Sequence, residues 1–588
     1  MSLDTAVHGA TLPGERRISF PGGIAPAFLV LLIGLLIPVG IFFFYGFWQQ
    51  DIFGLVKTWD LQQYSSAVGD AFFRGLIFRT LLTGLLVAMV CVPIAFFTSY
   101  VINFSLRRGR SAVLFAIVMS MLTSYLVRIY AWKLILGPRG VINGALQAIG
   151  LTDQPLDFLL FGRFAVVVTL VHILLPFAVL PIFAAMQAVD PEALRASRDL
   201  GAGPIVTLLR VTLPLTAHGV AVSFLFVFIL SAGDYVTPQL VGGQGGLLIG
   251  RVIYDQFGIT KNWPLASALS FTLIAGFGIT VLILRGLLSL GGRAVKPSRI
   301  RSLRRPLLPA RASSWLRQLP FGEIWVIGVL CFLFIPLLVV IVFSFNDSSI
   351  SAFPMRGVTG RWYAEALNDS SFRHAFVTSV LLATLVSALA VAVGVPAGFA
   401  LVRRRFALRG MMNLILLLPL SLPGIIIGFS ILSMAVTVGA KPGFLTAALG
   451  QLTLLFPFVV LVTVARLRDF DRSVEEAGRD LGCSPAVVMR KVTLPIIAPT
   501  IIGAAILVLA LSMDEFIVTL YTAGSSTTLP ILVWGLMQKR GISPAVNAIA
   551  TVLLLASFLV LIAGGLIVRL RERRFKLHGL ARAIGREL

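Results

Sequence analysis

Long apolar stretches alternate with short polar segments along the whole chain. A helix needs about 20 apolar residues to cross about 30 Å of hydrocarbon, and twelve stretches reach that length. Backbone polar groups in lipid must be satisfied within each segment, and the alternating pattern of a membrane barrel is absent, so the pattern predicts an all-α polytopic membrane protein. The predicted spans lie near residues 24–46, 76–102, 111–136, 164–187, 208–233, 264–289, 322–345, 374–401, 411–439, 446–467, 495–518 and 546–569.

Composition and charge agree with this class. The 588 residues are 57% hydrophobic and 13% charged, whereas a soluble globular protein has about 25% charged residues. The net charge of +24 could indicate nucleic-acid binding, but its distribution argues against that partner. With Arg16 and Arg17 placed inside, 34 of the 49 Lys and Arg fall in inside segments, while the acidic residues divide 13 to 12. This positive-inside bias predicts cytoplasmic N- and C-termini.

The remaining basic clusters and the cysteines suggest no further chemistry. Cys91, Cys331 and Cys483 have no spacing that predicts a disulfide framework or a zinc site. The first twenty residues lead into a long first span, which we expect to be a signal anchor. Basic clusters at the ends of spans favour contact with anionic lipid of the bilayer. The clusters are Arg107–Arg110, Arg403–Arg405 and Arg571–Lys576.

One polar segment occurs twice. Asp190–Pro214 and Asp471–Pro495 agree at 12 of 25 positions without a gap, at an offset of 281 residues. The same offset places Pro176 of the fourth span on Pro457 of the tenth. Each half therefore repeats six spans, with its copy of the duplicated polar segment between the fourth and the fifth. We call these two segments, Asp190–Pro214 and Asp471–Pro495, the polar islands. Because six is even, both halves enter from the same side and are expected to be parallel repeats, related by an axis along the membrane normal.

The repeat divides the chain into three parts. We predict a first six-span half at 1–290, a linker at 291–320 and a second six-span half at 321–588. The linker is rich in Arg and Lys and has almost no acid, which is typical of a mobile cytoplasmic segment. We interpret it as the scar of a fusion between two once-separate subunits. A regulatory or lipid-binding role is the alternative.

Each island has the signals of a short helix. An aspartate can cap such a helix, a glycine can end it, and a proline prevents its continuation. A short helix lying across the membrane surface would transmit a push to both adjoining spans. An ordinary interfacial helix with solvated charges is the alternative. The signals are Asp190, Gly201 and Pro204 in segment 190–204, and Asp471, Gly482 and Pro485 in segment 471–485.

The islands resemble the coupling loops of ABC importer permeases, which have a Glu-Ala-Ala triplet, three residues, Gly, and then nine residues to Ile-x-Leu-Pro. The second copy follows this pattern with Glu476-Ala477-Gly478, Gly482 and Val492–Pro495. The resemblance implies the type I importer permease fold, in which each loop sits in a cleft of one cytoplasmic ATPase subunit. Closure of the ATPase pair on ATP then switches the permease from inward-open to outward-open.

The first copy departs from the pattern. Arg195-Ala196-Ser197 replaces the triplet, and Glu192 lies one turn earlier, where it could substitute. We therefore expect two coupling loops with unequal contacts to the two ATPase copies. The residues implied to contact the ATPase are Glu192, Arg195, Arg198, Asp199, Gly201, Glu475, Glu476, Arg479, Asp480 and Gly482.

The chain is expected to be a transporter subunit and not an enzyme. No cytoplasmic segment contains the G-x-x-x-x-G-K-[S/T] phosphate loop that binds nucleotide phosphates. We expect no cofactor in this chain, with ATP and Mg bound by the partner ATPase. A membrane enzyme would need a buried nucleophile–base or metal constellation, and the five scattered histidines indicate none.

Longer segments resemble the spermidine/putrescine-type branch of these permeases, one subunit in each half. The resemblance implies a bacterial inner-membrane permease that receives a polyamine from a periplasmic binding protein. Related permeases carry opines, amino-acid derivatives and phosphonates, so an anionic or zwitterionic solute is the alternative. A secondary transporter is the less favoured alternative, since it needs no docking helix before the fifth span of each half. The segments are 124–143, 174–184, 233–243, 262–270, 345–349, 361–369, 419–432 and 511–530.

Carboxylates at the ends of two spans are candidates for the substrate pathway. Ionisable residues at membrane depth are costly and usually face a cavity or a partner. Asp234 and Tyr235 end the fifth span, and Asp514 and Glu515 take the equivalent place in the eleventh. Carboxylates with an aromatic face could bind a polycation. The alternative is that these acids cap helix N-termini or pair with Arg or Lys of the third span.

The third span adds candidates of mixed character. A lone Arg128 would repel a polyamine, so we expect it to pair with Asp234 or Asp514; unpaired, it would favour an anionic substrate. His172 is expected to be a hydrogen-bonded packing residue. The aromatics of this span line the pathway or simply lie at the membrane interface. The third-span candidates are Tyr125, Arg128, Tyr130 and Trp132.

Four outer loops are long enough to dock a binding protein. They are 47–75, 137–163, 234–263 and 346–373. The last of them is a candidate polar docking rim, with Asp347, Arg356, Arg361, Trp362, Glu365 and Asp369.

Overall fold

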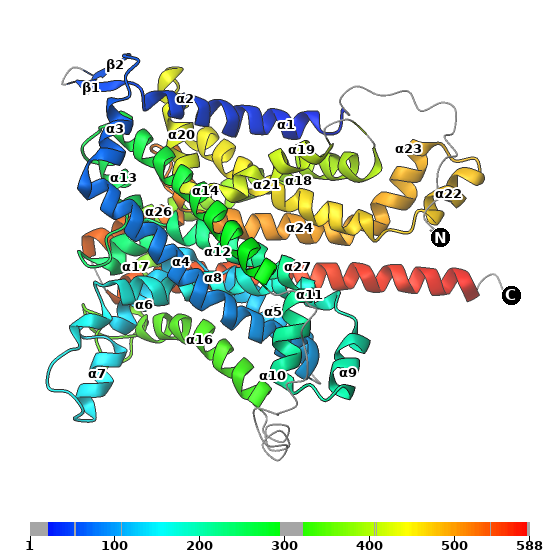
Figure 1. Cartoon of the computed structure of the whole chain (residues 1–588), viewed down its shortest axis with the longest axis horizontal. Helices are drawn as coiled ribbons and strands as arrows, with labels where there is room; N and C mark the ends of the chain where they lie inside the picture. Colours follow the sequence, from blue (N-terminus) through cyan, green and yellow to red (C-terminus); the bar gives the residue numbers. More distant parts are fainter. Residues whose placement is uncertain are drawn as a thin grey trace.

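The chain folds into helices with one small hairpin (Figure 1). The computed structural model describes residues 22–51, 54–106, 109–294, 321–404, 406, 409–540 and 543–584. The first half contains α1 (Ala25–Leu31), η1 (Leu32–Leu36), α2 (Ile37–Tyr45), β1 (Gln49–Asp51), β2 (Gly54–Val56), α3 (Gln62–Gly69), α4 (Ala71–Tyr100), η2 (Val101–Ser105), α5 (Arg110–Met121), α6 (Tyr125–Leu136), α7 (Val141–Ala148), η3 (Asp157–Leu159), α8 (Arg163–Gln187), α9 (Pro191–Asp199), α10 (Pro204–Thr207), η4 (Leu208–Thr212), α11 (Leu213–Leu215), α12 (Ala217–Ala232), η5 (Pro238–Gly242), α13 (Ile249–Gly258) and α14 (Trp263–Ala294).

The second half is built from the same kind of elements. Helix α14 runs four residues into the predicted linker, and the rest of that linker, 295–320, lies outside the described residues. The second half contains α16 (Phe321–Phe343), α17 (Arg361–Asn368), α18 (Ser370–Arg403), α19 (Arg409–Leu417), η7 (Leu418–Ser421), α20 (Gly424–Thr437), α21 (Phe444–Arg468), α22 (Ser473–Asp480), α23 (Pro485–Val488), η8 (Met489–Thr493), α24 (Leu494–Asp514), α25 (Ile517–Thr522), α26 (Leu529–Arg540) and α27 (Pro544–Ile584).

All twelve predicted spans correspond to helices, but three are not continuous. Within the described ranges, nine helices are long and apolar enough to cross a membrane, and three bent helix pairs bring the total to twelve. The hydropathy pattern did not indicate that the third, fifth and ninth spans are interrupted: the helix axes turn by 90°, 78° and 98° there.

Two of these bends coincide with a polar side chain or a proline. Thr216 Oγ1 donates to Thr212 O at 2.7 Å in the fifth span, and such back-bonding competes with the helix. Its equivalent in the eleventh span is Ile497, where the helix Pro485–Asp514 continues without a sharp bend. In the ninth span Pro423 directly precedes α20, and the residue before it, Leu422, has extended backbone, because proline disfavours helix in the preceding residue.

The two halves repeat one three-helix arrangement. Helices α4, α8 and α12 pack on one another, and α18, α21 and α24 do the same. Small residues permit the close approach of membrane helices: Gly84 faces the side chain of Ala232, and Gly394 faces that of Val459. This repetition agrees with the duplicated sequence.

The offset of 281 residues holds only for the last three spans of each half. Asp70 caps α4 and Asp369 caps α18 through backbone N–H groups two residues later, at 2.7 and 2.8 Å. These equivalent residues are 299 apart in the sequence. The first half thus has 18 additional residues, which form α7 and η3 between α6 and α8.

The first helix of each half packs against the other half. Ile24, Ala27, Leu31 and Leu35 belong to the core of the second half, beside α18 and α21. The α16 residues Val326, Val329, Leu333 and Val340 belong to the core that contains α4, α6 and α8. The two halves are therefore intertwined and do not meet at a single flat surface.

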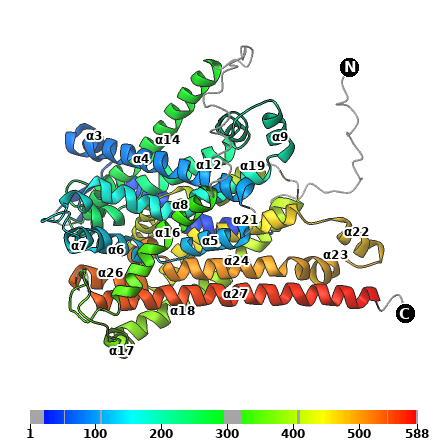
Figure 2. The ribbon, with the colours of Figure 1, turned by 90° about the horizontal axis from the view of Figure 1, so that it is seen from below.

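The elements separate into two ends of the helix bundle. Figures 1 and 2 show α9 and α22 at the same end, well apart from each other, with the C-terminal part of α27. The hairpin, α3, α7 and α17 lie at the opposite end. The duplicated polar segments therefore present two separate points at one end of the molecule.

Candidate functional site

The two short helices of the islands have the same termini. The N–H of Glu192 donates to Asp190 Oδ1 at 2.9 Å, and the N–H of Ser473 donates to Asp471 Oδ1 at 3.0 Å. The latter bond holds the pKa of Asp471 below its usual range. Gly201 and Gly482 both have φ of +82°, a left-handed conformation that favours glycine. The predicted helices and their glycine ends are confirmed.

Contacts with the base of the next span hold each short helix. In the first copy, Ser197 Oγ and Thr207 Oγ1 are 3.0 Å apart. The equivalent residues in the second copy are Gly478 and Val488, and a Cβ on Gly478 would lie 3.2 Å from Val488 Cγ2. At this position the first copy therefore has a polar contact, and the second has a glycine close to an apolar side chain.

A buried ion pair anchors the second short helix. Arg403 Nη2, at the end of α18, lies 2.9 Å from Glu475 Oε1, which also accepts a bond from Thr493 Oγ1 at 2.8 Å. Glu475 is therefore the buried acid of α22, whereas the motif residue Glu476 is exposed. At the position of Glu475, the first copy has the buried apolar Leu194.

The free faces of the short helices present charges and one leucine each. Leu200 is 89% exposed and Leu481, its equivalent, is 85% exposed. Such exposure of a large apolar side chain at the same place in both copies indicates a contact surface. The side chain of Arg198 lies outside the described residues. The exposed charged candidates are Glu192, Arg195, Asp199, Glu476, Arg479 and Asp480.

The acids at the ends of the fifth and eleventh spans cap the helices that follow. Asp234 accepts bonds from Val236 N at 2.9 Å and Thr237 Oγ1 at 2.5 Å. Glu515 accepts bonds from Val518 N at 2.8 Å and Thr519 N at 2.9 Å. Both acids are thus engaged in local caps in this conformation, as the capping alternative states.

Tyr125 connects the acids of the two halves. Its hydroxyl donates to Asp234 Oδ1 at 2.5 Å and its backbone N–H donates to Asp514 Oδ2 at 2.9 Å. Arg128, one turn further along α6, donates to Ile173 O at 3.2 Å. No ion pair within 4.0 Å joins Arg128 to a carboxylate among the described residues. The expected pairing is therefore not a salt bridge within 4.0 Å in this conformation, but Arg128 lies near enough to Asp514 to interact with it electrostatically.

The other pathway candidates are buried in packing contacts. Tyr130 Oη accepts a bond from Ser543 N at 3.0 Å, and the Trp132 ring lies 5.8 Å from the His172 ring. His172 Nε2 is 3.1 Å from Leu333 O of α16, which confirms the packing interpretation. Tyr235 is fully buried and stacks on Tyr254 at 5.3 Å.

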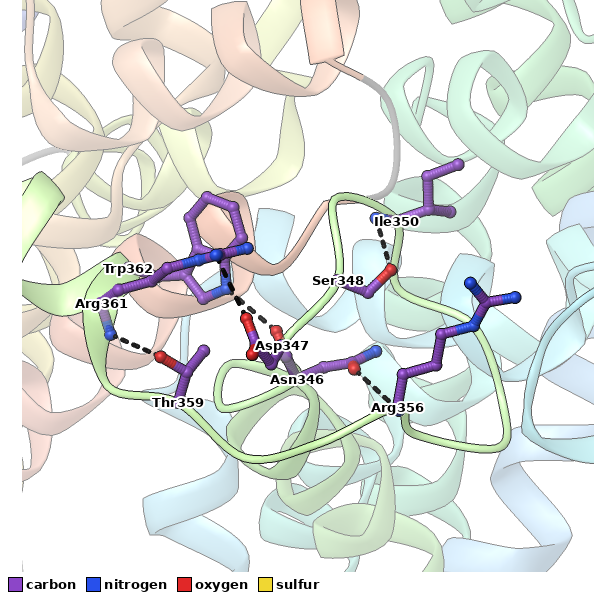
Figure 3. Close-up of polar contacts among 8 residues, drawn as sticks. All are labelled: Asn346, Asp347, Ser348, Ile350, Arg356, Thr359, Arg361 and Trp362. Atoms are coloured by element: carbon purple, nitrogen blue, oxygen red, sulfur yellow. Dashed lines mark hydrogen bonds and ion pairs between the residues drawn. The ribbon is translucent and has the colours of Figure 1, made fainter.

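The loop after α16 is a polar surface joined by hydrogen bonds and an ion pair (Figure 3). Trp362 Nε1 donates to Asn346 O at 2.9 Å, and the Arg361 guanidinium lies 4.4 Å from the Trp362 ring and 3.2 Å from Asp347 Oδ1. Figure 3 shows the Arg356 guanidinium directed away from these contacts. The loop is tied to the insertion of the first half, because Phe353 N donates to Arg139 O at 3.1 Å.

Several residues of these sites were not selected from the sequence. Leu200 and Leu481 belong to the shared Arg-Asp-Leu-Gly motif, so their repetition was the available signal. Arg403 was selected only as part of a basic cluster expected to face anionic lipid; it pairs instead with Glu475, which could not be predicted because the two residues are 72 apart in the sequence. Tyr254 and Tyr521 meet Tyr235 only in the folded chain. Of the predicted basic clusters, Arg107, Arg108 and Arg405 lie outside the described residues, as do the side chains of 571–576.

Comparison with known proteins gives consistent matches. The family model "Binding-protein-dependent transport system inner membrane component" matches residues 390–577. The spermidine/putrescine transport system permease protein PotC of Escherichia coli (strain K12) is 33% identical over 243 residues, 41% of this chain and 91% of the relative. PotB of the same system and strain is 32% identical over 238 residues, 40% of this chain and 86% of the relative. Each match covers most of a relative and less than half of this chain, consistent with a fusion of two such proteins.

One solved structure gives a weaker match. A bacterial ABC transporter involved in the import of the acidic polysaccharide alginate aligns at 20% identity, over 46% of this chain and 94% of that chain. Its TM-score of 0.38 is too low to support a conclusion about the arrangement of the helices.

Proposed function

Because the chain belongs to the family of binding-protein-dependent transport system inner membrane components, we propose that it supplies both membrane halves of an ATP-driven polyamine importer. The proposed solute is spermidine, putrescine or a related cation. It is received from a periplasmic binding protein and released to the cytoplasm. The proposed location is the bacterial inner membrane, with α9 and α22 on the cytoplasmic side.

The observation that supports this proposal most strongly is the geometry of the two short helices. Both lie at one end of the bundle, both end in a glycine with φ of +82°, and both expose an equivalent leucine. Two equivalent docking points suit two copies of a cytoplasmic ATPase subunit. ATP and Mg bind in that partner, and the chain itself contributes no nucleotide site.

The proposed mechanism is alternating access driven from these helices. Movement of α22 passes to α18 through Arg403 and Glu475, and to the continuous span that contains α24. Movement of α9 passes through contacts with α10 and a span that bends by 78°. The two halves therefore respond differently to the same closure of the ATPase pair.

The polyamine assignment is supported by the names of the relatives and by the acidic ends of two spans. Asp234, Asp514 and Glu515 gather near Tyr125 and the seam between the halves. These carboxylates place negative charge beside the boundary between the two halves, which favours a cationic solute over an anionic one. The polar loop around Trp362 is the proposed docking surface for the binding protein.

An anionic or zwitterionic solute is the second candidate. The observation that favours it is Arg128, which has no carboxylate partner within 4.0 Å in the described ranges. A phosphonate or an opine could supply a negative group in direct contact with Arg128, which interacts with Asp514 only at longer range. This candidate uses the same membrane halves and the same ATPase partner.

Uptake by the reconstituted complex separates the two candidates. Proteoliposomes would contain the chain with its ATPase, and each radiolabelled solute would be presented on the binding protein. The proposal predicts ATP-dependent uptake of spermidine or putrescine, and none of an alkylphosphonate or an opine. Uptake of the anion alone would replace the polyamine assignment with the second candidate.

A further inference from the structure

A groove opens between the first and the last described helix of the second half. Helices α16 and α17 both pack on α27, and a cavity of about 320 Å³ lies where the three meet. This volume is at the lower end of the range for sites that bind small molecules. The groove is lined by Ile341 of α16, Phe345 just after it, Tyr363 of α17, and Thr551 and Leu555 of α27.

The hydroxyl groups of this lining are already bonded within the protein. Thr551 Oγ1 donates to Asn547 O at 2.8 Å. Ser344 Oγ donates to Ile341 O at 2.5 Å and accepts from the Tyr363 hydroxyl at 2.6 Å. A water molecule in a cavity needs about two to four polar partners, which the rest of this lining does not supply. The groove therefore suits an apolar ligand.

The surface beside the groove faces hydrocarbon. Val342 of α16 is 50% exposed, and Leu555 and Leu559 of α27 are 48% and 66% exposed. Both helices are long and apolar enough to span the membrane, as Gly322–Phe343 and Pro544–Leu566. Exposed apolar side chains on such spans contact lipid tails, which are as apolar as leucine. Because the groove is continuous with this lipid-facing surface, its natural ligand is an acyl chain.

The groove lies toward the end of the molecule opposite the two polar islands. The span Pro544–Leu566 has 23 residues, with Thr551 in its first half and Leu555 at its middle. Tyr363 lies on α17, which Figure 1 shows at that same end. With α9 and α22 on the cytoplasmic side, as proposed above, the groove opens to the outer leaflet.

The hydrophobic core holds both long walls of the groove in place. Val340, next to Ile341, and Leu553, between Thr551 and Leu555, are fully buried in the same core. On the other side of the groove, the ring of Phe345 packs against that of Tyr363, with 5.2 Å between the centroids. The groove is therefore a fixed feature of the packed helices.

We propose that this groove binds one acyl chain of a phospholipid of the outer leaflet. The chain lies against Phe345 and Leu555 and needs no hydrogen bond in the groove. In an apolar medium its retention depends on close van der Waals contact with the walls, and not on removal of apolar surface from water. The inference is independent of the transported solute, since it holds equally for a polyamine and for an anion.

Filling the groove or removing one of its walls tests the site. Leu555→Trp places a larger side chain at a half-exposed position of the groove, and Phe345→Ala removes an aromatic wall. The full chain would be incubated in detergent with dioleoyl phosphatidylethanolamine and exchanged into lipid-free detergent. Native mass spectrometry then measures the phospholipid retained per chain. We expect about tenfold less in each variant, because the contacts between wall and acyl chain are lost.

Leu559→Trp is the matched control. It adds the same side chain one turn further along α27, at a more exposed residue that does not line the groove, and should retain as much phospholipid as the original chain. Added phospholipid should also raise the Tm of the original chain and of Leu559→Trp more than that of Leu555→Trp.

Two results would overturn the inference. One is equal retention of phospholipid by Leu555→Trp, Phe345→Ala and the control, with all three eluting as monodisperse proteins. The other is no retained phospholipid on the original chain. Oleate would be offered in competition, and retention of oleate in place of the phospholipid would contradict a bilayer lipid as the source of the acyl chain.

Discussion

Arg403 at the end of α18 pairs with Glu475 on α22, with 2.9 Å between Nη2 and Oε1. The equivalent residues of the first half, at offsets of 299 and 281, are Phe104 and Leu194. The short helix is therefore anchored by an ion pair in one half and has apolar residues at the same positions in the other. The sequence already showed another difference between the two copies: Arg195 of the first copy stands where the second copy has Glu476.

The fold should tolerate replacement of Arg403 and Glu475 only when both residues are changed together. Glu475→Leu or Arg403→Phe alone leaves a largely buried charge without its partner, which costs about 3 kcal/mol. The double variant installs the residue types of the first half and should recover most of that loss. Reversible unfolding in detergent, analysed as a double-mutant cycle, measures the coupling. Additive single effects would show that the pair does not anchor α22.

The exposed leucines should determine ATPase binding. Leu200→Asp and Leu481→Asp each place a charge on a side chain that is 89% or 85% exposed, so folding should be unaffected. A buried charge at the centre of an interface costs at least about 2 kcal/mol, and more than a tenfold loss of ATPase retention is expected. Co-purification of the ATPase provides the measurement. Ile149→Asp, at the exposed residue that follows α7, a helix of the opposite end, is the matched control and should retain the ATPase.

The two glycines should tolerate asparagine and not valine. A Cβ at Gly201 or Gly482 has nothing within 4 Å, so only the φ of +82° limits substitution. Left-handed backbone costs about 1–2 kcal/mol for ordinary residues and less for asparagine. Gly201→Val and Gly482→Val should uncouple ATP hydrolysis from transport, while the asparagine variants remain coupled. Equal coupling in all four variants would remove these turns from the mechanism.

Much of the fold could be predicted because hydropathy depends on local composition. All twelve spans were placed from apolar length, and the termini of α9 and α22 followed from Asp, Gly and Pro. The bends at Thr216 and Pro423 were missed, since hydropathy reports how long a span is and not its direction. Proline alone does not decide a bend: Pro93 and Pro457 lie inside continuous helices.

The contacts between distant segments could not be predicted. The ion pair of Arg403 and Glu475 and the meeting of Tyr235 with Tyr521 depend on tertiary packing. The packing of the first helix of each half against the other half could not be predicted either, because a duplicated sequence does not show on which half a helix packs. The 18-residue insertion could have been found, since Asp70 and Asp369 are 299 residues apart while the islands are 281 apart.

Separate halves should remain associated. Residues of α1 lie in the core of the second half and residues of α16 lie in the core of the first. Two chains divided within 295–320 should therefore assemble when expressed together, and a tag on one should retain the other. Deletion of 22–45 from the first chain should abolish this retention. Independent purification of two folded halves would contradict the intertwined arrangement.

The energy source is the most direct test of the central claim, that this chain is the membrane part of an ATP-driven importer. Vesicles would contain the chain with or without its ATPase, and spermidine would be supplied on the binding protein. The account predicts uptake only when the ATPase and ATP are both present, and none when an ion gradient is imposed without them. Uptake that persists with an ion gradient and no ATPase would identify a secondary transporter and contradict the account.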